Sequence, residues 1–423
     1  MKRLLFVLAA CGNSGGGTPD AAPMQPVANP DREIVDTGLV VDYAGKTTVA
    51  QITFGPGADG ASVETGTLTI DSVTVNGAPI TFTTADKQTD LGLPASTDPV
   101  VVTFSYSWTT HENFEGISAK GWTLDWPYYC GNVFPCHSHP VDGTTFSLQL
   151  NNTPDGKTAV YPQTIPNQAP AYQLAWSIDA YTQLDLGTTA AGTLVSTWYR
   201  AGEETKAMTG TQHLLAAFDW LETHLGPYTF GNHYGSVAVT WPIGAIGGME
   251  HHPFIHIGGG IDDENTQVHE ASHGWFGDGI RLACWEDFVL SEGTVSYLAN
   301  HALEAVGGTP TWTADATELA SQSGSDAVWI PSTCNVIDVN KIFTRALYDR
   351  GEFFYKGIAD KIGADKLDQA LTTFYMAHKS QPARMQDMLD TIQQVTGYDP
   401  SACAQTWLLD TSSATPPTPG PCP

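Results

Sequence analysis

Two histidines and a glutamate near the middle of the chain have the types and spacing of a metal site. His269 and His273 are four residues apart, so a helix places both imidazoles on one face, about 6 Å apart along its axis. Two such nitrogens can bind one tetrahedral zinc ion. Glu292 follows His273 after eighteen intervening residues and supplies a third ligand. Three protein ligands leave a fourth position for water, which is typical of catalytic zinc.

Glu270 lies between the two histidines, one step round the helix, where it can reach a metal-bound water without being a ligand. Zinc would lower the pKa of that water toward ~7 and polarise a scissile carbonyl, and Glu270 would act as the general base. The five-residue motif alone also fits a surface helix with two solvated histidines. Glu292, beside Trp285 and Asp287, argues against that alternative. We expect one zinc ion per chain.

The length and charge of the chain limit its class and its partners. With 423 residues it can form two or three domains with buried cores. The formal net charge is -27, with only 18 Lys and Arg residues. This balance argues against nucleic acid and against an anionic membrane surface as partners. Its simplest meaning is solubility.

The N-terminus has the features of an export signal. In residues 1–10, Lys and Arg precede an apolar run and small residues. Leu8-Ala9-Ala10-Cys11 resembles a bacterial lipobox, which implies cleavage before Cys11 and lipidation of its thiol. Residues 11–30 are rich in Gly, Ser, Pro and Ala and predict a flexible linker. We expect an exported protein held in the bacterial cell envelope by lipid alone; the alternative is an ordinary secretory signal and a secreted protein.

The hydrophobic periodicity divides the remaining chain in two. Residues 31–204 alternate between apolar and polar side chains, with turn signals such as Asn76-Gly77, and predict an antiparallel β-sandwich or saddle-like sheet domain. Residues 205–410 are mainly helical, with a core stripe in 214–225 and further helices in 348–370 and 385–395. Residues 411–423 form a Pro-rich, irregular tail. The fold class is therefore α+β, with more than one domain.

Six cysteines remain if Cys11 carries lipid, and an even number in an exported protein indicates disulfides. Six cysteines allow fifteen connectivities. Our choice is the two local pairs, which leaves one distant pair. A thiolate zinc site is the alternative, but no Cys-x-x-Cys is present. The three expected pairs are Cys130–Cys136, Cys403–Cys422 and Cys284–Cys334.

The zinc motif stands among segments that together resemble the M1 family of zinc aminopeptidases. Gly247-Gly248-Met249-Glu250-His251 is similar to the family's Gly-x-Met-Glu-Asn and precedes the zinc helix. Tyr348-Asp349-Arg350-Gly351 is similar to its Tyr-Glu-Lys-Gly, and Phe134-Pro135-Cys136-His137-Ser138-His139-Pro140 to its Phe-Pro-Cys-x-Asp-Glu-Pro. The resemblance covers roughly residues 31–400.

The resemblance implies a thermolysin-like catalytic domain, of the gluzincin type, that removes N-terminal residues from peptides. Tyr348 would donate a hydrogen bond to the oxyanion, although without its motif it reads as a packed aromatic. Glu250 would pair with the α-ammonium group of the substrate, and the backbone of Gly247, Gly248 and Met249 would bind the substrate as an added strand. We expect a monomer with peptide substrates.

The departures from the family pattern keep two other functions open. His251 replaces the family's Asn, and Ser291 stands where the block before the third ligand has Asn. The place of a second residue that binds the substrate amine falls on Leu124, with Asp125 adjacent. Either Asp125 replaces that residue after a shift of one position, or the contact is missing. The chain also stops where larger members continue into a helical C-terminal domain, so we expect a more open site. The alternatives are a zinc endopeptidase or other hydrolase on the same scaffold, and a catalytically dead surface-binding lipoprotein.

His251 and His252 could also serve as additional metal ligands. Satisfied polar residues beside a cleft are the simpler interpretation of this pair.

Overall fold

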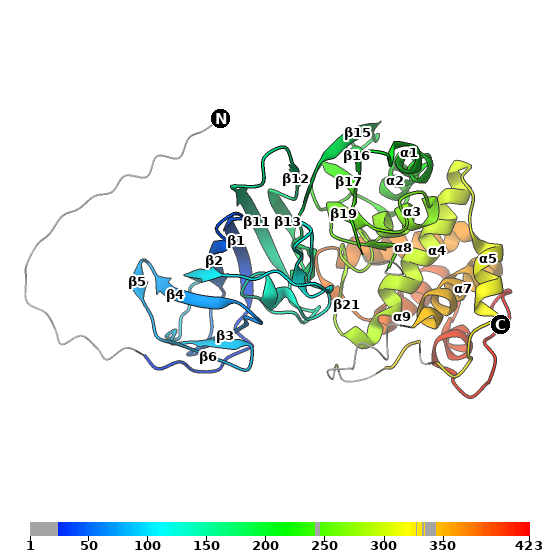
Figure 1. Cartoon of the computed structure of the whole chain (residues 1–423). Helices are drawn as coiled ribbons and strands as arrows, with labels where there is room; N and C mark the ends of the chain where they lie inside the picture. The colour runs from blue at the N-terminus through cyan, green and yellow to red at the C-terminus, as the bar shows by residue number, and fades with distance from the viewer. Residues whose placement is uncertain (1–23, 242–245, 327, 332–333, 335–343) are drawn as a thin grey trace, which may run out of the picture.

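The structure is a computed structural model that describes residues 24–241, 246–326, 328–331, 334 and 344–423. β-Sheets form the N-terminal body, and most of the helices gather in the C-terminal body beside it (Figure 1). Cys11, the export signal and most of the expected linker lie outside the described residues. Among the described residues, no helix is long and apolar enough to cross a membrane.

The N-terminal body is built on a seven-stranded sheet with the order β13-β11-β1-β2-β8-β4-β5. Alternate residues of its strands are buried, as in β2, where Ala50, Ile52 and Phe54 are fully buried and their neighbours face outward. The pairings are antiparallel except for β1 with β11, which is parallel. The strands are β1 (Ile34–Asp42), β2 (Thr47–Phe54), β4 (Thr69–Val75), β5 (Ala78–Pro79), β8 (Val100–Ser107), β11 (Thr144–Asn151) and β13 (Thr164–Ala169).

Smaller sheets complete this body and confirm the predicted sheet domain. A three-stranded sheet has the order β3-β7-β6. Asn76 and Gly77, the predicted turn, connect β4 to β5 with φ of 50° and 78°, and two positive φ angles are what a tight hairpin turn requires. The smaller strands are β3 (Ala61–Glu64), β6 (Phe82–Ala85), β7 (Gln88–Leu91), β9 (Gly116–Ile117), β10 (Thr123–Leu124), β12 (Thr158–Val160) and β14 (Ser177–Asp179).

The C-terminal body begins earlier in the chain than the sequence predicted. Its five-stranded sheet has the order β15-β16-β17-β19-β18, so β15 and β16 share a sheet with strands of the zinc-motif domain. The predicted boundary at residues 204–205 is therefore displaced to a point before Tyr181. Strand patterning cannot reveal this, because alternation is the same whichever strand is the partner. The strands are β15 (Tyr181–Thr188), β16 (Leu194–Arg200), β17 (His233–Ala238), β18 (Gly248–Met249) and β19 (Phe254–Ile257).

Helices pack around this sheet and confirm the predicted helical segments. The stripe in 214–225 is fully buried in α2, and the helices expected in 348–370 are α7 and α8, separated at Gly363. Gly363 has a φ of 95°, which favours glycine and ends α7. The helices are α1 (Glu204–Gly210), α2 (Leu214–Leu225), α3 (Glu264–Ser272), α4 (Val289–Val306), α5 (Trp312–Leu319), α7 (Arg345–Ile362), α8 (Ala364–His378), α9 (Met385–Thr396) and α10 (Ser401–Ala404).

The two bodies are joined through Arg281, which lies in β20 (Arg281–Leu282) beside β21 (Pro382–Ala383). Its guanidinium group donates to the carbonyls of Val141 and Gln168 in the N-terminal body, at 3.3 and 2.5 Å. It also donates to the carbonyl of Ser380 in the C-terminal body, at 3.0 Å. One buried cation thus binds both bodies.

The C-terminal tail and the disulfides follow the predictions, but the end of the expected linker does not. The tail 411–423 contains no regular element, and all three expected disulfides are present. The last described part of the expected linker, however, lies on the β3-β7-β6 sheet. The amide of Val27 donates to the carbonyl of Leu91 at 3.5 Å, and the amide of Asn29 donates to the Ser62 hydroxyl at 2.8 Å.

Candidate active site

The predicted metal ligands are held on two packed helices. His269 lies in the last turn of α3, and His273 caps its C-terminal end. Asp263 fixes the start of α3, because its side chain accepts hydrogen bonds from the amides of Asn265 and Thr266. Glu292 lies in the first turn of α4. The separation of eighteen residues lets the chain turn back and bring α4 against α3.

The donor atoms are close enough to hold one ion. Nε2 of His269 lies 3.0 Å from Oε2 of Glu292, and Nε2 of His273 lies 3.5 Å from the same oxygen. Bonds of about 2.1 Å at tetrahedral angles put zinc ligands about 3.4 Å apart. Two imidazoles and a carboxylate are also a donor set that zinc prefers. These residues therefore fit a zinc ion.

Second contacts orient His273 toward this centre. Its Nδ1 atom lies 3.1 Å from the carbonyl of Phe276 and 3.2 Å from the hydroxyl of Ser291. With Nε2 facing the metal position, Nδ1 carries the proton and donates to these oxygens. Gly277, with a φ of 105°, makes room, since a Cβ there would lie 2.2 Å from the Ser291 hydroxyl. The sequence showed Ser291 only as a departure from the family pattern.

Two further carboxylates face the same imidazole. Donor atoms of Glu250, Glu270 and His273 all lie within 4.8 Å of one another. Burial raises the pKa of Glu270 well above its usual range and that of Glu250 to about 7. Glu292, Glu250 and Glu270 together raise the pKa of His273 despite its burial. A cation bound beside them would stabilise the ionised form of these carboxyl groups.

The edge strand β18 approaches α3 closely. Glu250 follows β18 directly, and a Cβ on Gly248 would lie 2.5 Å from Cγ of Glu270. Only glycine therefore allows the strand to lie against the carboxylate of Glu270, the predicted base. The carbonyl of Gly247 accepts hydrogen bonds from the amides of Gly258 and Gly260, at 2.9 and 3.3 Å. Gly247, Gly248, Met249 and Glu250 all line the cleft, as the sequence predicted.

Tyr348 reaches the centre from α7. Its ring stacks on the imidazole of His269, with centroids 6.0 Å apart. Burial and the nearby carboxylates raise the pKa of Tyr348 well above its usual range, so its hydroxyl stays protonated and can donate. Gly293 and Gly351 set the distance between α4 and α7, because a Cβ on either would lie within 2.7 Å of the other's Cα.

The rest of the tyrosine motif has a structural role. Arg350 is fully buried and donates to the backbone carbonyls of Trp407, Asp326 and Asp410, at 2.7, 2.9 and 2.9 Å. It thereby fixes the C-terminal segment against α7.

These groups line one cleft of about 920 Å³ between the two bodies. Asp125 is not among its lining residues: it is 1% exposed and lies behind Leu124 and Trp126, which do line the cleft. The proposed replacement of the second amine-binding residue by Asp125 is therefore not supported by the geometry.

His251 and His252 lie outside the donor set. Nδ1 of His251 is 3.1 Å from Nδ1 of His256, while His252 contacts the Tyr228 hydroxyl at 2.8 Å and the Glu270 carbonyl at 3.0 Å. Burial lowers the pKa of His252 and of His256 to about 3. His252 and His256 are therefore neutral packing residues. His252 also supports the backbone of Glu270, the predicted base.

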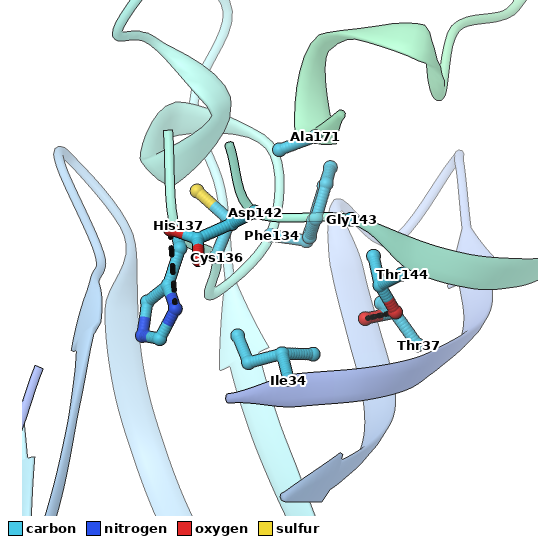
Figure 2. A pocket seen from close by; sticks show the side chains of 9 residues that line it. All are labelled: Ile34, Thr37, Phe134, Cys136, His137, Asp142, Gly143, Thr144 and Ala171. Carbon is cyan, nitrogen blue, oxygen red and sulfur yellow. Dashed lines mark hydrogen bonds and ion pairs between the residues drawn. The ribbon is translucent and has the colours of Figure 1, made fainter. Parts of the chain in front are cut away.

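A second, small cavity lies in the N-terminal body, between β1 and the loop that contains the Phe-Pro-Cys motif. Figure 2 shows His137 paired with Asp142 at its edge, with Nδ1 and Oδ2 3.8 Å apart. Its volume of about 10 Å³ holds no more than one water molecule. The motif residues thus pack within the N-terminal body and do not line the larger cleft.

The sheet, the helix with both histidines against it and the glutamate of the next helix form the arrangement predicted for a zinc peptidase. Residues 262–407 match the model of the peptidase family M1 domain. The fold is similar to that of an M1 zinc metallopeptidase from Deinococcus radiodurans, with a TM-score of 0.77, 18% identity, and coverage of 92% of this chain and 96% of that chain. The match supports the predicted resemblance of residues 262–407 to the M1 peptidases.

Curated relatives agree with this resemblance. The chain is 21% identical over 397 residues to an aminopeptidase N of Lactobacillus delbrueckii subsp. lactis, covering 81% of this chain and 46% of that protein. It is 24% identical over 151 residues to aminopeptidase M1-C of Oryza sativa subsp. japonica, covering 34% of this chain and 17% of that protein. The chain therefore spans less than half the length of these curated relatives.

Proposed function

We propose that this chain is a zinc-dependent aminopeptidase that removes the first residue of peptides. The observation that carries the proposal is the position of Glu250: a buried carboxylate lies within 4.8 Å of the predicted base, at the rim of the His-His-Glu donor set. A carboxylate at this place can pair with a free α-ammonium group and so fix the first peptide bond at the zinc position.

The chain's own residues can perform each proton transfer. A zinc ion held by His269, His273 and Glu292 would supply an activated water and polarise the scissile carbonyl. Glu270, with its raised pKa, takes the proton from the attacking water and delivers it to the leaving amine. Tyr348 donates to the oxyanion as the carbonyl becomes tetrahedral.

Peptide substrates are consistent with the comparisons. One structural neighbour from Deinococcus radiodurans holds a Tyr-Ser-Ala substrate. The runner-up function is a zinc endopeptidase, favoured by one observation: Asp125 is behind the cleft wall, so Glu250 lacks this expected second carboxylate.

Zinc content together with activity on amino-acid amides tests the proposal. We expect about one zinc per chain and hydrolysis that a chelator abolishes and zinc restores. Well under half an equivalent after zinc-supplemented expression, with activity unaffected by chelators, would contradict it. Zinc without hydrolysis of free or blocked peptides would favour the dead surface-binding protein.

We also propose that the protein is exported and attached to the bacterial cell envelope through lipidated Cys11. Three disulfides among the described residues support export, because disulfides persist in oxidising compartments. Mass spectrometry of the mature N-terminus and the membrane partition of Cys11→Ala test this. An unmodified N-terminus, or an unchanged partition, would contradict it.

A further inference from the structure

The lining of the active-site cleft contains two chemically different groups of residues. One group is apolar and mostly aromatic; it consists of Phe114, Leu124, Trp126, Tyr128, Tyr129 and Phe288, here called the aromatic wall. The other group is charged, with Asp315 and, on α7, Arg345 and Glu352. The metal position and Tyr348 lie within the same cleft.

The aromatic wall is a packed unit. The rings of Trp126 and Phe288 stack with centroids 5.7 Å apart. Trp285 lies behind them, with its ring edge-on to Trp126 at 5.7 Å and to Tyr128 at 5.9 Å. Trp126, Tyr128 and Tyr129 are only partly buried, so part of each ring faces the cleft. Such a unit gives a preformed surface for an apolar side chain.

Contacts through the N-terminal body connect the wall to the amine-binding carboxylate. The Gln173 amide group donates to the backbone carbonyl of Glu250 at 2.9 Å. The preceding residue, Tyr172, lies against Trp285, with ring centroids 6.3 Å apart. Gln173, Tyr172 and Trp285 thus link the backbone of Glu250 to the back of the aromatic wall, and Glu250 lines the same cleft as the wall.

The charged group surrounds the proposed oxyanion donor. Arg345 is placed over the ring of Tyr348, 5.8 Å from its centroid, and Glu352 is one helical turn beyond Tyr348 on the same face. The surroundings of Tyr348 on α7 are therefore polar, in contrast to the aromatic wall.

We infer that the aromatic wall binds the first side chain of the substrate and selects large apolar or aromatic residues there. The inference rests on the proposed aminopeptidase function. The Cα that carries the ammonium group also carries this side chain, and the aromatic wall is the apolar surface that this cleft offers to it. Carboxylates also line the cleft, including Glu115 next to Phe114 of the wall, so acidic first residues are disfavoured.

The test is a panel of amino-acid amides with free amines, measured on the zinc-loaded full chain. We expect kcat/KM for Phe and Leu to exceed that for Ala by about 10- to 100-fold, and Glu to be poorest. A preference for Ala, for Lys or Arg, or for Glu would overturn the inference and leave the aminopeptidase proposal standing. Failure to cleave any free-amine substrate would instead overturn the aminopeptidase proposal.

Substitutions locate the preference on the wall. Trp126→Ala should lower kcat/KM for the Phe amide at least tenfold and for the Ala amide less than threefold. Tyr129→Ala should show the same pattern more weakly and serves if Trp126→Ala does not fold. Trp220→Ala is the matched control, because Trp220 stacks on His224 in α2, outside the cleft. Folded wall variants that keep the wild-type ratio of Phe to Ala would refute the assignment.

Discussion

Replacing a buried neutral histidine should make the protein less sensitive to acid. His256, in β19, is 1% exposed, and burial lowers its pKa to about 3. In the unfolded chain its pKa is about 6.5. Because the pKa of His256 is lower in the folded chain, the contribution of neutral His256 to folding stability is complete above pH 6.5. That contribution is lost as the pH falls through 6.5 toward 3. Below pH 6.5 the unfolded chain gains a proton that the folded chain refuses.

The size of the effect follows from the two pKa values. Between pH 7.5 and pH 5 one such histidine lowers the free energy of unfolding by about 2 kcal/mol. This is about 1.5 pH units below the unfolded pKa, at about 1.36 kcal/mol per unit. His256→Phe removes this term. Its absolute stability falls at both pH values, because Nδ1 of His251 loses the partner at 3.1 Å. Its further loss between pH 7.5 and pH 5 should nevertheless be about 2 kcal/mol smaller than that of the wild type.

Denaturant unfolding of both proteins at pH 7.5 and pH 5 measures the difference. Other titrating groups, and any bound metal, contribute equally to the two proteins and cancel. His252→Phe provides a second test, because burial also lowers the pKa of His252 to about 3. If both variants lose as much stability as the wild type over this range, the histidines are not buried in the neutral form and the reasoning is wrong.

Three substitutions at the centre separate the proposed roles. Glu270→Gln should keep zinc and lose nearly all turnover, since it removes a base and no ligand; metal loss or retained turnover would mean a different role. Tyr348→Phe should lower kcat by about 10²–10³ with KM little changed, the usual loss for one oxyanion donor, and a near-wild-type kcat would move that role elsewhere. Ser291→Ala should weaken zinc binding about tenfold in chelator competition, since it removes a partner of His273 at 3.2 Å; unchanged affinity would leave the Phe276 carbonyl as the sufficient partner.

Local patterns predicted most of the fold and the centre of the site. The spacing of His269, His273 and Glu292 is fixed by helix geometry and a short return of the chain, so the sequence was sufficient to bring them together. The alternation of apolar and polar residues before position 200 predicted strands, because it too is a pattern of local backbone geometry. Disulfide pairing was predictable because two of the pairs are local.

The remaining features depend on contacts between distant segments. Whether β16 pairs with the N-terminal sheet or with β17 is decided by tertiary packing, which strand periodicity does not encode. Asp125 and Trp126 are adjacent in sequence, yet one lies behind the cleft wall and the other lines it. The aromatic wall combines Phe114 and Trp126 with Phe288, which lies more than 150 positions later in the chain. No motif signals such a surface.

The most direct test of the central claim compares matched peptides with free and N-acetylated first residues. A charge-assisted contact from Glu250 is worth about 1.5–3 kcal/mol, or roughly ten- to a hundredfold in kcat/KM. We therefore predict at least a tenfold preference of the zinc-loaded wild type for the free amine, and loss of most of that preference in Glu250→Ala. Equal rates on both peptides with the wild type would contradict the aminopeptidase account and establish the endopeptidase alternative.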